Sequence, residues 1–140
     1  MKDLYFTIPG QPKGKARPRV TRYGTYTPKE TREFEALIRQ CWKDQTGGIS
    51  LPTDTPIRCS IHAYFSVPKS LSKKKQRELY NQPHTKKPDC DNIAKAVLDS
   101  LNGYAFHDDS AVSELRIEKI YTDAEPYIGV YLSAISFGEE

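Results

Sequence analysis

Alternating apolar and polar residues along the chain predict four strands. Residues 4–8 ("LYFTI") alternate and stop at a Pro-Gly pair, and residues 57–67 ("IRCSIHAYFSV") give the longest alternation, with one apolar and one polar face. Residues 112–121 and 127–135 have the same period. We expect these last two segments to form a hairpin around "TDAEP", because turn residues separate them.

A helical period is clearest over residues 27–42. Thr27, Pro28 and Glu30 predict an N-terminal capping box, in which the Thr27 side chain caps the first turn. Apolar residues then recur at helical spacing and predict a buried stripe of Phe34, Leu37, Ile38, Cys41 and Trp42.

Two further segments complete the predicted elements. Residues 91–102 form an amphipathic helix followed by Gly103 as the residue just past its end, and residues 70–79 form a short basic helix or turn. The segment 11–27 has no period and reads as a loop, or as a β-ribbon through "RVTRYGTYT". The order of elements predicts an α+β fold, a single mixed β-sheet of about four strands with helices packed mainly on one face. At 140 residues we expect one domain, residues 1–140.

Composition leads us to expect a cytoplasmic protein. No apolar run approaches the roughly 18 residues of a membrane span, and the start of the chain lacks the apolar region of a secretory signal. The three cysteines, Cys41, Cys59 and Cys90, are far apart and form no CxxC pair. This spacing argues against a disulfide framework and against a zinc site.

The net charge of +3 hides a strong segregation of charge. Residues 11–22 and 69–87 together hold 12 of the 21 basic residues and one of the 18 acidic residues. Such segments suit a polyanion, and we expect them to contact its backbone of negative charges. The predicted contacts are Lys13, Lys15, Arg17, Arg19, Lys69, Lys73, Lys74, Lys75, Arg77, Lys86 and Lys87.

Two pairs of aspartates flank the helix over residues 91–102. Asp89 and Asp91 precede it and Asp108 and Asp109 follow it. One reading is helix capping, worth roughly 0.5 to 2 kcal/mol. The other is a metal site: if the chain runs back along the helix so that the pairs meet, their oxygens suit Mg²⁺ or Mn²⁺. Spacing alone does not separate the two.

The neighbouring charges favour the metal site. Clustered carboxylates repel phosphate unless a cation lies between them, so a protein that only binds DNA has no use for them. A nucleotide hydrolase would not need 12 basic residues in two segments. Lys95 follows Asp91 by one turn, where it could pair with Asp91 or Asp99 or reach a phosphate. The rival hypothesis is a non-catalytic, structure-specific DNA-binding protein whose aspartates cap a helix.

The stretch "KKPDCDNIAKAVLDSLNG…FHDDSAV" resembles the signature of the RusA-type Holliday junction resolvases, PD-x-DN-x-x-K-x-x-x-D followed by a DD pair. "IPGQPKGKARPR" and "TYTPKETREFE" are similar to the prophage and Gram-positive branch of that family. The resemblance implies a homodimer that makes Mg²⁺-dependent paired nicks in four-way DNA junctions during recombination or repair. It places the metal-binding aspartates on Asp89 and Asp91, the motif lysine on Lys95, and the third acidic ligand on Asp109 in preference to Asp108.

The tyrosines offer a second way to bind DNA. Nine are present, among them Tyr5, Tyr23, Tyr26 and Tyr64, and they could stack on exposed bases at a branch point. Aromatic strand residues more often pack against their neighbours, which is the simpler expectation.

Overall fold

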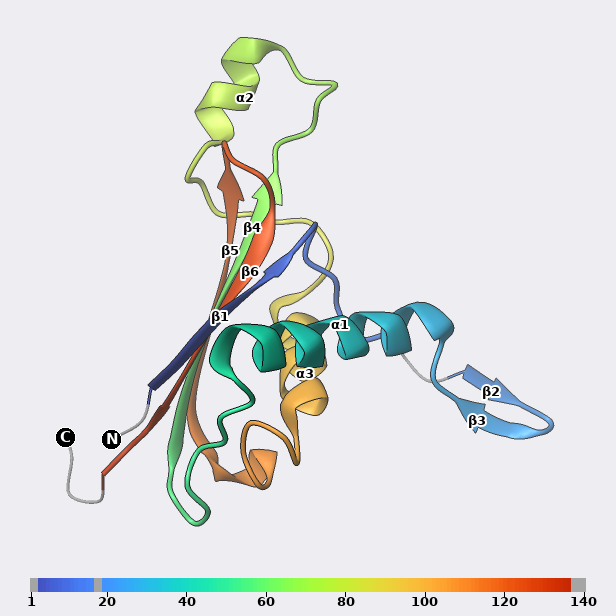
Figure 1. Ribbon diagram of the computed structural model, residues 1–140. Coiled ribbons are helices and arrows are strands. Elements are labelled where there is room, and N and C mark those ends of the chain that lie inside the picture. The colour runs from blue at the N-terminus through green and yellow to red at the C-terminus, as the bar shows by residue number, and fades with distance from the viewer. Residues whose placement is uncertain (1–2, 17–18, 137–140) are drawn as a thin grey trace.

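A four-stranded mixed sheet forms the centre of the protein in a computed structural model that describes residues 3–16 and 19–136 (Figure 1). The strands are β1 (Asp3–Pro9), β4 (Ile57–Ser66), β5 (Val112–Thr122) and β6 (Tyr127–Ala134), in the spatial order β1-β6-β4-β5. β4 and β5 are parallel, and β6 is antiparallel to both of its neighbours. The α+β fold and the mixed sheet are confirmed.

The predicted hairpin between the last two strands is wrong. β4 lies between β5 and β6, and its apolar positions from Ile57 to Phe65 are buried. A strand of this kind occupies the middle of a sheet, where both of its edges are paired. β5 and β6 are therefore about 10 Å apart. The four residues of the connection 123–126 are long enough to cross the end of β4, since each extended residue covers about 3.3 Å.

Helices α1 (Lys29–Thr46) and α3 (Cys90–Leu101) cover one face of the sheet (Figure 1). Their buried side chains join the inward residues of all four strands in one hydrophobic cluster. The largest fully buried side chains are Phe6, Ile8, Ile38, Ile57, Ile61, Ile93, Val97, Leu101, Phe106, Ile128, Val130 and Leu132. The prediction of helices mainly on one face is confirmed.

The start and the stripe of α1 differ in detail from the prediction. Pro28 is the N-cap residue and no side chain caps the first turn, so the predicted capping box is wrong. Leu37 is 39% exposed, whereas Thr31 is buried one turn before Phe34. The buried stripe of α1 therefore begins at Thr31, one turn nearer the N-terminus of the helix, and omits Leu37.

A hairpin, a short helix and a 3-10 turn complete the fold. β2 (Arg19–Thr21) and β3 (Gly24–Tyr26) pair with each other as a separate hairpin, which confirms the β-ribbon, and Figure 1 shows it projecting beyond the first turn of α1. The short basic helix is α2 (Lys73–Leu79), and a 3-10 turn, η1 (Asp109–Ala111), precedes β5. No helix within residues 3–16 and 19–136 is long and apolar enough to cross a membrane.

Candidate functional site

The first aspartate pair lies at the N-terminus of α3. Asp89 is the N-cap residue, and its main-chain carbonyl accepts the N–H of Ile93 at 3.1 Å. Its carboxylate makes no capping hydrogen bond. Asp91 lies in the first turn, and both residues are exposed. Within the described ranges neither carboxylate has a hydrogen bond or an ion pair, so side-chain capping does not account for this pair.

The second aspartate pair lies at the other end of the same helix. The Asp109 N–H donates to the side-chain oxygen of Asn102, the C-cap residue of α3, at 3.1 Å. The Asp108 carboxylate accepts the N–H of Ser110 at 3.0 Å. α3 has 12 residues and is about 18 Å long.

No hydrogen bond or ion pair among the described residues joins the two pairs. The charges of Lys95 and Asp99, both in α3, nevertheless act on Asp109, so this aspartate lies beside the helix. Among the described residues, no group of three or more His, Cys, Asp or Glu side chains is arranged to hold a metal ion.

The second pair is electrostatically coupled. The backbone N–H of Ser110 lowers the pKa of Asp108. Partial burial raises the pKa of Asp109, and a hydrogen bond with Asp108 and the charge of that neighbour raise it further. Asp99 also raises the pKa of Asp109, whereas Lys95 lowers it. Asp109 therefore holds a proton more readily than Asp108 does.

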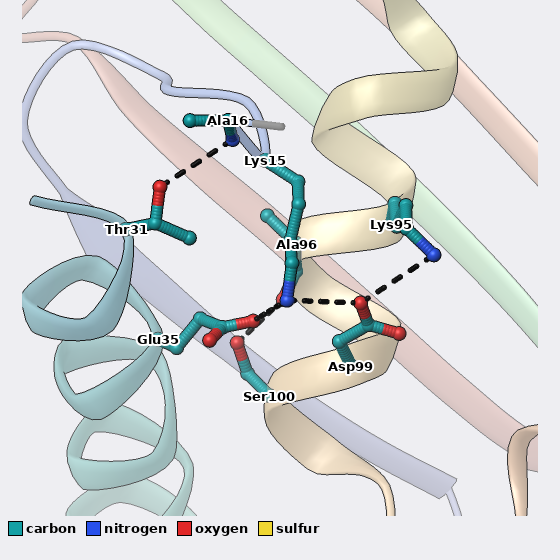
Figure 2. Close-up of polar contacts among 8 residues, drawn as sticks. All are labelled: Lys15, Ala16, Thr31, Glu35, Lys95, Ala96, Asp99 and Ser100. Carbon is teal, nitrogen blue, oxygen red and sulfur yellow. Dashed lines mark hydrogen bonds and ion pairs between the residues drawn. The ribbon is translucent and has the colours of Figure 1, made fainter. Parts of the chain in front are cut away.

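A cluster of four charged side chains joins α1, α3 and the loop after β1 (Figure 2). Lys15 Nζ lies 2.8 Å from Glu35 Oε2 and 3.1 Å from Asp99 Oδ2. Lys95 Nζ lies 3.7 Å from the same Asp99 oxygen, which is the i, i+4 pair that the sequence offered. Lys95 is largely exposed, so its ammonium group is still open to solvent.

Lys15 therefore has a structural role where we predicted a contact with DNA. Its side chain is 17% exposed and that of Glu35 is 13% exposed. Burial alone would lower the pKa of Lys15, but the hydrogen bonds with Glu35 and Asp99 outweigh it and raise the pKa. The positive charge is permanently present and is neutralised inside the protein.

Gly14 brings the basic loop against the first turn of α3. A Cβ atom at Gly14 would lie 2.9 Å from the Cβ of Asn92 and 3.1 Å from the Cβ of Pro88, closer than side chains pack. The Lys15 N–H donates to the Asn92 carbonyl at 2.9 Å. Only glycine allows this approach, so Gly14 fixes the loop beside Asp89 and Asp91.

Lys119 holds the segment that leads into α3. Its Nζ donates to the carbonyls of Lys86 and Pro88, the latter at 2.8 Å. It comes from β5, which lies at the edge of the sheet. The sequence gives one signal for this role, because Lys119 occupies an inward position between Ile117 and Tyr121 where the alternation calls for an apolar residue.

Most of the predicted DNA contacts are accessible. Those with an exposed side chain and no ion pair to the described residues are Lys13, Lys69, Lys73, Lys74, Lys75, Arg77, Lys86 and Lys87. Arg17 and the side chain of Arg19 lie outside the described part of the chain. The accessible cations are therefore concentrated on and around α2 and immediately before α3.

Two carboxylates without partners beside accessible lysines are typical of the active site of a nuclease. Comparison with known proteins supports the assignment to the nucleases. Residues 9–133 match the family described as "Endodeoxyribonuclease RusA", and the chain belongs to that family. One relative is the "Uncharacterized protein YqaN" of Bacillus subtilis (strain 168). The two sequences are 30% identical over an alignment of 147 positions, which covers 97% of this chain and 99% of the relative.

Proposed function

We propose that the protein is a metal-dependent endodeoxyribonuclease that resolves Holliday junctions and related branched DNA by paired phosphodiester cleavage in recombination or repair. Membership of the RusA family supports the reaction and the DNA substrate. The observation that carries the proposal to particular residues is the state of Asp89 and Asp91. Both carboxylates are exposed, and neither is engaged by the described residues.

This carboxylate pair suits Mg²⁺. In phosphate-processing sites Mg²⁺ commonly binds one or two carboxylates, with substrate phosphate and water as the other ligands. Asp89 and Asp91 would hold the ion, and Mn²⁺ accepts the same oxygen donors. A bound ion supplies activation of water and stabilisation of the developing negative charge. The roles of Asp109 and Asp108 as further ligands remain predictions.

The remaining residues bind and orient the substrate. Lys95 is exposed one turn beyond Asp91, where its ammonium group can neutralise the scissile phosphate or orient the attacking water. Lys86 and Lys87 immediately precede the aspartates and would hold the adjacent backbone. A four-way junction has two-fold symmetry, so two active sites related by a two-fold axis are the simplest way to make paired cuts. We therefore include a homodimer in the proposal.

The test is the Asp91→Asn variant, incubated with labelled four-way, flap and linear DNA with Mg²⁺ or EDTA. Cleavage by the variant is expected to fall by several orders of magnitude, because a ligand loses its negative charge. The free energy of unfolding is expected to change by less than about 1 kcal/mol, since asparagine is tolerated at a helix N-terminus about as well as aspartate. Binding of DNA without metal is expected to hold or tighten, because one charge that repels phosphate is gone.

Asp123→Asn is the matched control, because Asp123 is an exposed aspartate in the connection between β5 and β6. It is expected to cleave at the wild-type rate. Asp109→Asn, measured in the same way, decides whether the second pair contributes to cleavage. Near wild-type cleavage by a folded Asp91→Asn protein would remove Asp91 from the site. Binding of branched DNA by wild-type protein with no cleavage in Mg²⁺ would favour the non-catalytic DNA-binding protein.

A further inference from the structure

The β2–β3 hairpin projects away from the main sheet and the helices (Figure 1). Its register pairs Val20 with Thr25 and Thr21 with Gly24, so Arg22 and Tyr23 form the tip. A two-stranded ribbon of this length has little stability of its own. Its exposed tip therefore calls for an explanation other than the packing of the core.

The tip presents an aromatic ring and a cation to solvent. Tyr23 is 86% exposed and Val20 is 79% exposed. The Arg22 guanidinium lies 5.1 Å from the centre of the Tyr23 ring, and its Nη2 donates to the Tyr23 hydroxyl at 2.9 Å. This arrangement holds the ring and the positive charge together at the end of the ribbon.

Other tyrosines behave as the simpler expectation predicts and pack against each other on the sheet. The ring centres of Tyr5 and Tyr131 are 4.4 Å apart, and those of Tyr64 and Tyr127 are 4.7 Å apart. Tyr23 differs because the only ring contact it makes with the described residues is the one with its neighbour Arg22. Its face is available to an external partner.

The charge around the hairpin favours DNA as that partner. Residues 4–29 contain no Asp or Glu, and of their six basic residues Lys15 and Lys29 form ion pairs in the structure. The other four are Lys13, Arg17, Arg19 and Arg22. A segment with this charge attracts a polyanion. Backbone phosphates need only the cations, whereas an exposed aromatic ring binds the face of an unpaired base by stacking.

The point from which the hairpin projects is close to the candidate site. Gly14 and Lys15 contact the first turn of α3, and β2 begins four residues after Lys15. Four extended residues span about 14 Å. DNA with a phosphate at Asp89 and Asp91 would therefore pass the hairpin within a few base pairs of the cut.

We propose that the β2–β3 hairpin is a recognition arm whose tip, Tyr23 with Arg22, stacks on unpaired bases at a DNA branch point and selects branched DNA over continuous duplex. The inference rests on the proposed function and deepens it, because it assigns the preference for branched DNA to residues outside the carboxylate site. Unpaired or unstacked bases occur at a branch and are absent from continuous duplex.

The experiment places 2-aminopurine at the branch point of a four-way junction and, as a comparison, at the middle of a linear duplex, both with EDTA. Binding of wild-type protein is expected to change the 2-aminopurine fluorescence in the junction and leave it unchanged in the duplex. Tyr23→Ala is expected to abolish this change and to weaken junction binding about tenfold, with binding to the duplex unaltered. Tyr23→Phe keeps the ring and is expected to retain the signal.

Tyr131→Ala is the control, because Tyr131 is a half-exposed tyrosine on the main sheet. It is expected to behave as wild type. Equal weakening of junction and duplex binding by Tyr23→Ala would reduce the arm to a general backbone contact and overturn the proposal. So would unchanged DNA binding accompanied by a lower molecular mass, which would make the hairpin a contact between copies of the chain.

The two proposals fail in different ways. If wild-type protein alters the branch-point fluorescence but does not cut DNA with Mg²⁺, the nuclease proposal fails and the arm stands. If wild-type protein cuts junctions, and Tyr23→Ala binds and cuts them equally well, the arm fails and the nuclease proposal stands.

Discussion

Lys13 and Lys15 are two residues apart in the same basic segment but have different surroundings. Lys15 is nearly enclosed by Glu35 and Asp99, whereas Lys13 is exposed and has no ion pair with the described residues. Removal of one partner from a buried ion pair leaves an uncompensated charge, which is more costly than loss of an exposed charge. Substitution of Lys15 therefore tests its contribution to stability, and substitution of Lys13 tests its contribution to DNA binding.

Lys15→Met is expected to lower the free energy of unfolding by about 1 to 3 kcal/mol, because Glu35 and Asp99 lose their shared cation. Denaturant unfolding measures the change. Combining it with Glu35→Gln is expected to cost less than the sum of the single changes, since the two residues interact. Lys13→Met is the control, with a change within about 0.5 kcal/mol and weaker DNA binding. Equal effects of the two substitutions on stability would contradict the structural role of Lys15.

His84 makes stability depend on pH. Its Nδ1 is buried with no hydrogen-bond partner among the described residues, and its ring stacks on Phe65 with the centres 3.7 Å apart. Burial lowers the pKa of His84 below 6.5, and the charges of Lys119 and Lys86 lower it further. Protonation therefore favours the unfolded chain. The contribution of neutral His84 to stability is complete above about pH 6.5, and it is lost as the pH falls through the pKa of His84 in the folded protein.

His84→Phe keeps the stack on Phe65 and removes the titrating group. The free energy of unfolding of this variant is expected to fall less steeply between about pH 7 and pH 5 than that of wild type. Chemical denaturation at several pH values gives both curves. Parallel curves for the two proteins would show that His84 does not titrate in this range.

Prediction of single-residue roles from the sequence depended on how far apart the partners are. The pair Lys95 and Asp99 follows from helical spacing alone. The partners of Lys15 lie 20 and 84 positions along the chain, so no local pattern indicates them. The close contact of Gly14 with Pro88 and Asn92 likewise depends on packing between distant segments.

At the scale of elements, α2 is a short helix that presents its cations outward. The Ser72 side chain accepts the N–H of Lys75 at 3.2 Å, and Gln76 is buried and donates to the Leu71 carbonyl. These contacts fix the helix and leave its basic side chains exposed. Because α2 lies at one end of the sheet in Figure 1, well away from the β2–β3 hairpin, the two elements would contact different parts of a DNA substrate.

Replacing Lys73 and Lys74 by alanine is expected to weaken the binding of all DNA shapes alike. Each phosphate contact contributes about −0.9 to the slope of log affinity against log salt concentration, so the double variant loses up to about twice that amount. Binding titrations across a salt series measure the slope. Lys43→Ala, an exposed lysine in the last turn of α1, is the control with an unchanged slope. A wild-type slope for the double variant would show that α2 only contacts solvent.

The hydrophobic period predicted which elements form, but it did not predict which of them are neighbours. It placed the four strands of the main sheet and the two long helices, α1 and α3, close to their observed bounds. It paired β5 with β6, because a short connection favours a hairpin, whereas burial of both edges of β4 places that strand between them. The same limit applies to the aspartates, since the period cannot tell how close Asp108 and Asp109 lie to the first turn of α3.

At the scale of the whole molecule, the proposed paired cleavage has a measurable requirement. Two cuts within one binding event need two sites, so the active species is expected to have the mass of a dimer by light scattering. Cleavage of a plasmid with an extruded cruciform tests whether the two cuts are paired. Paired cuts yield linear product, whereas independent cuts yield nicked circles first. A monomer that still produces linear plasmid without a nicked intermediate would contradict the homodimer.

β6 is the last of the described elements to be synthesised, yet it lies between β1 and β4. Before residues 127–134 leave the ribosome, β1 has no partner in the main sheet and one edge of β4 is unpaired. An unpaired strand edge exposes backbone groups that need hydrogen bonds. The main sheet therefore closes only after translation has passed β6.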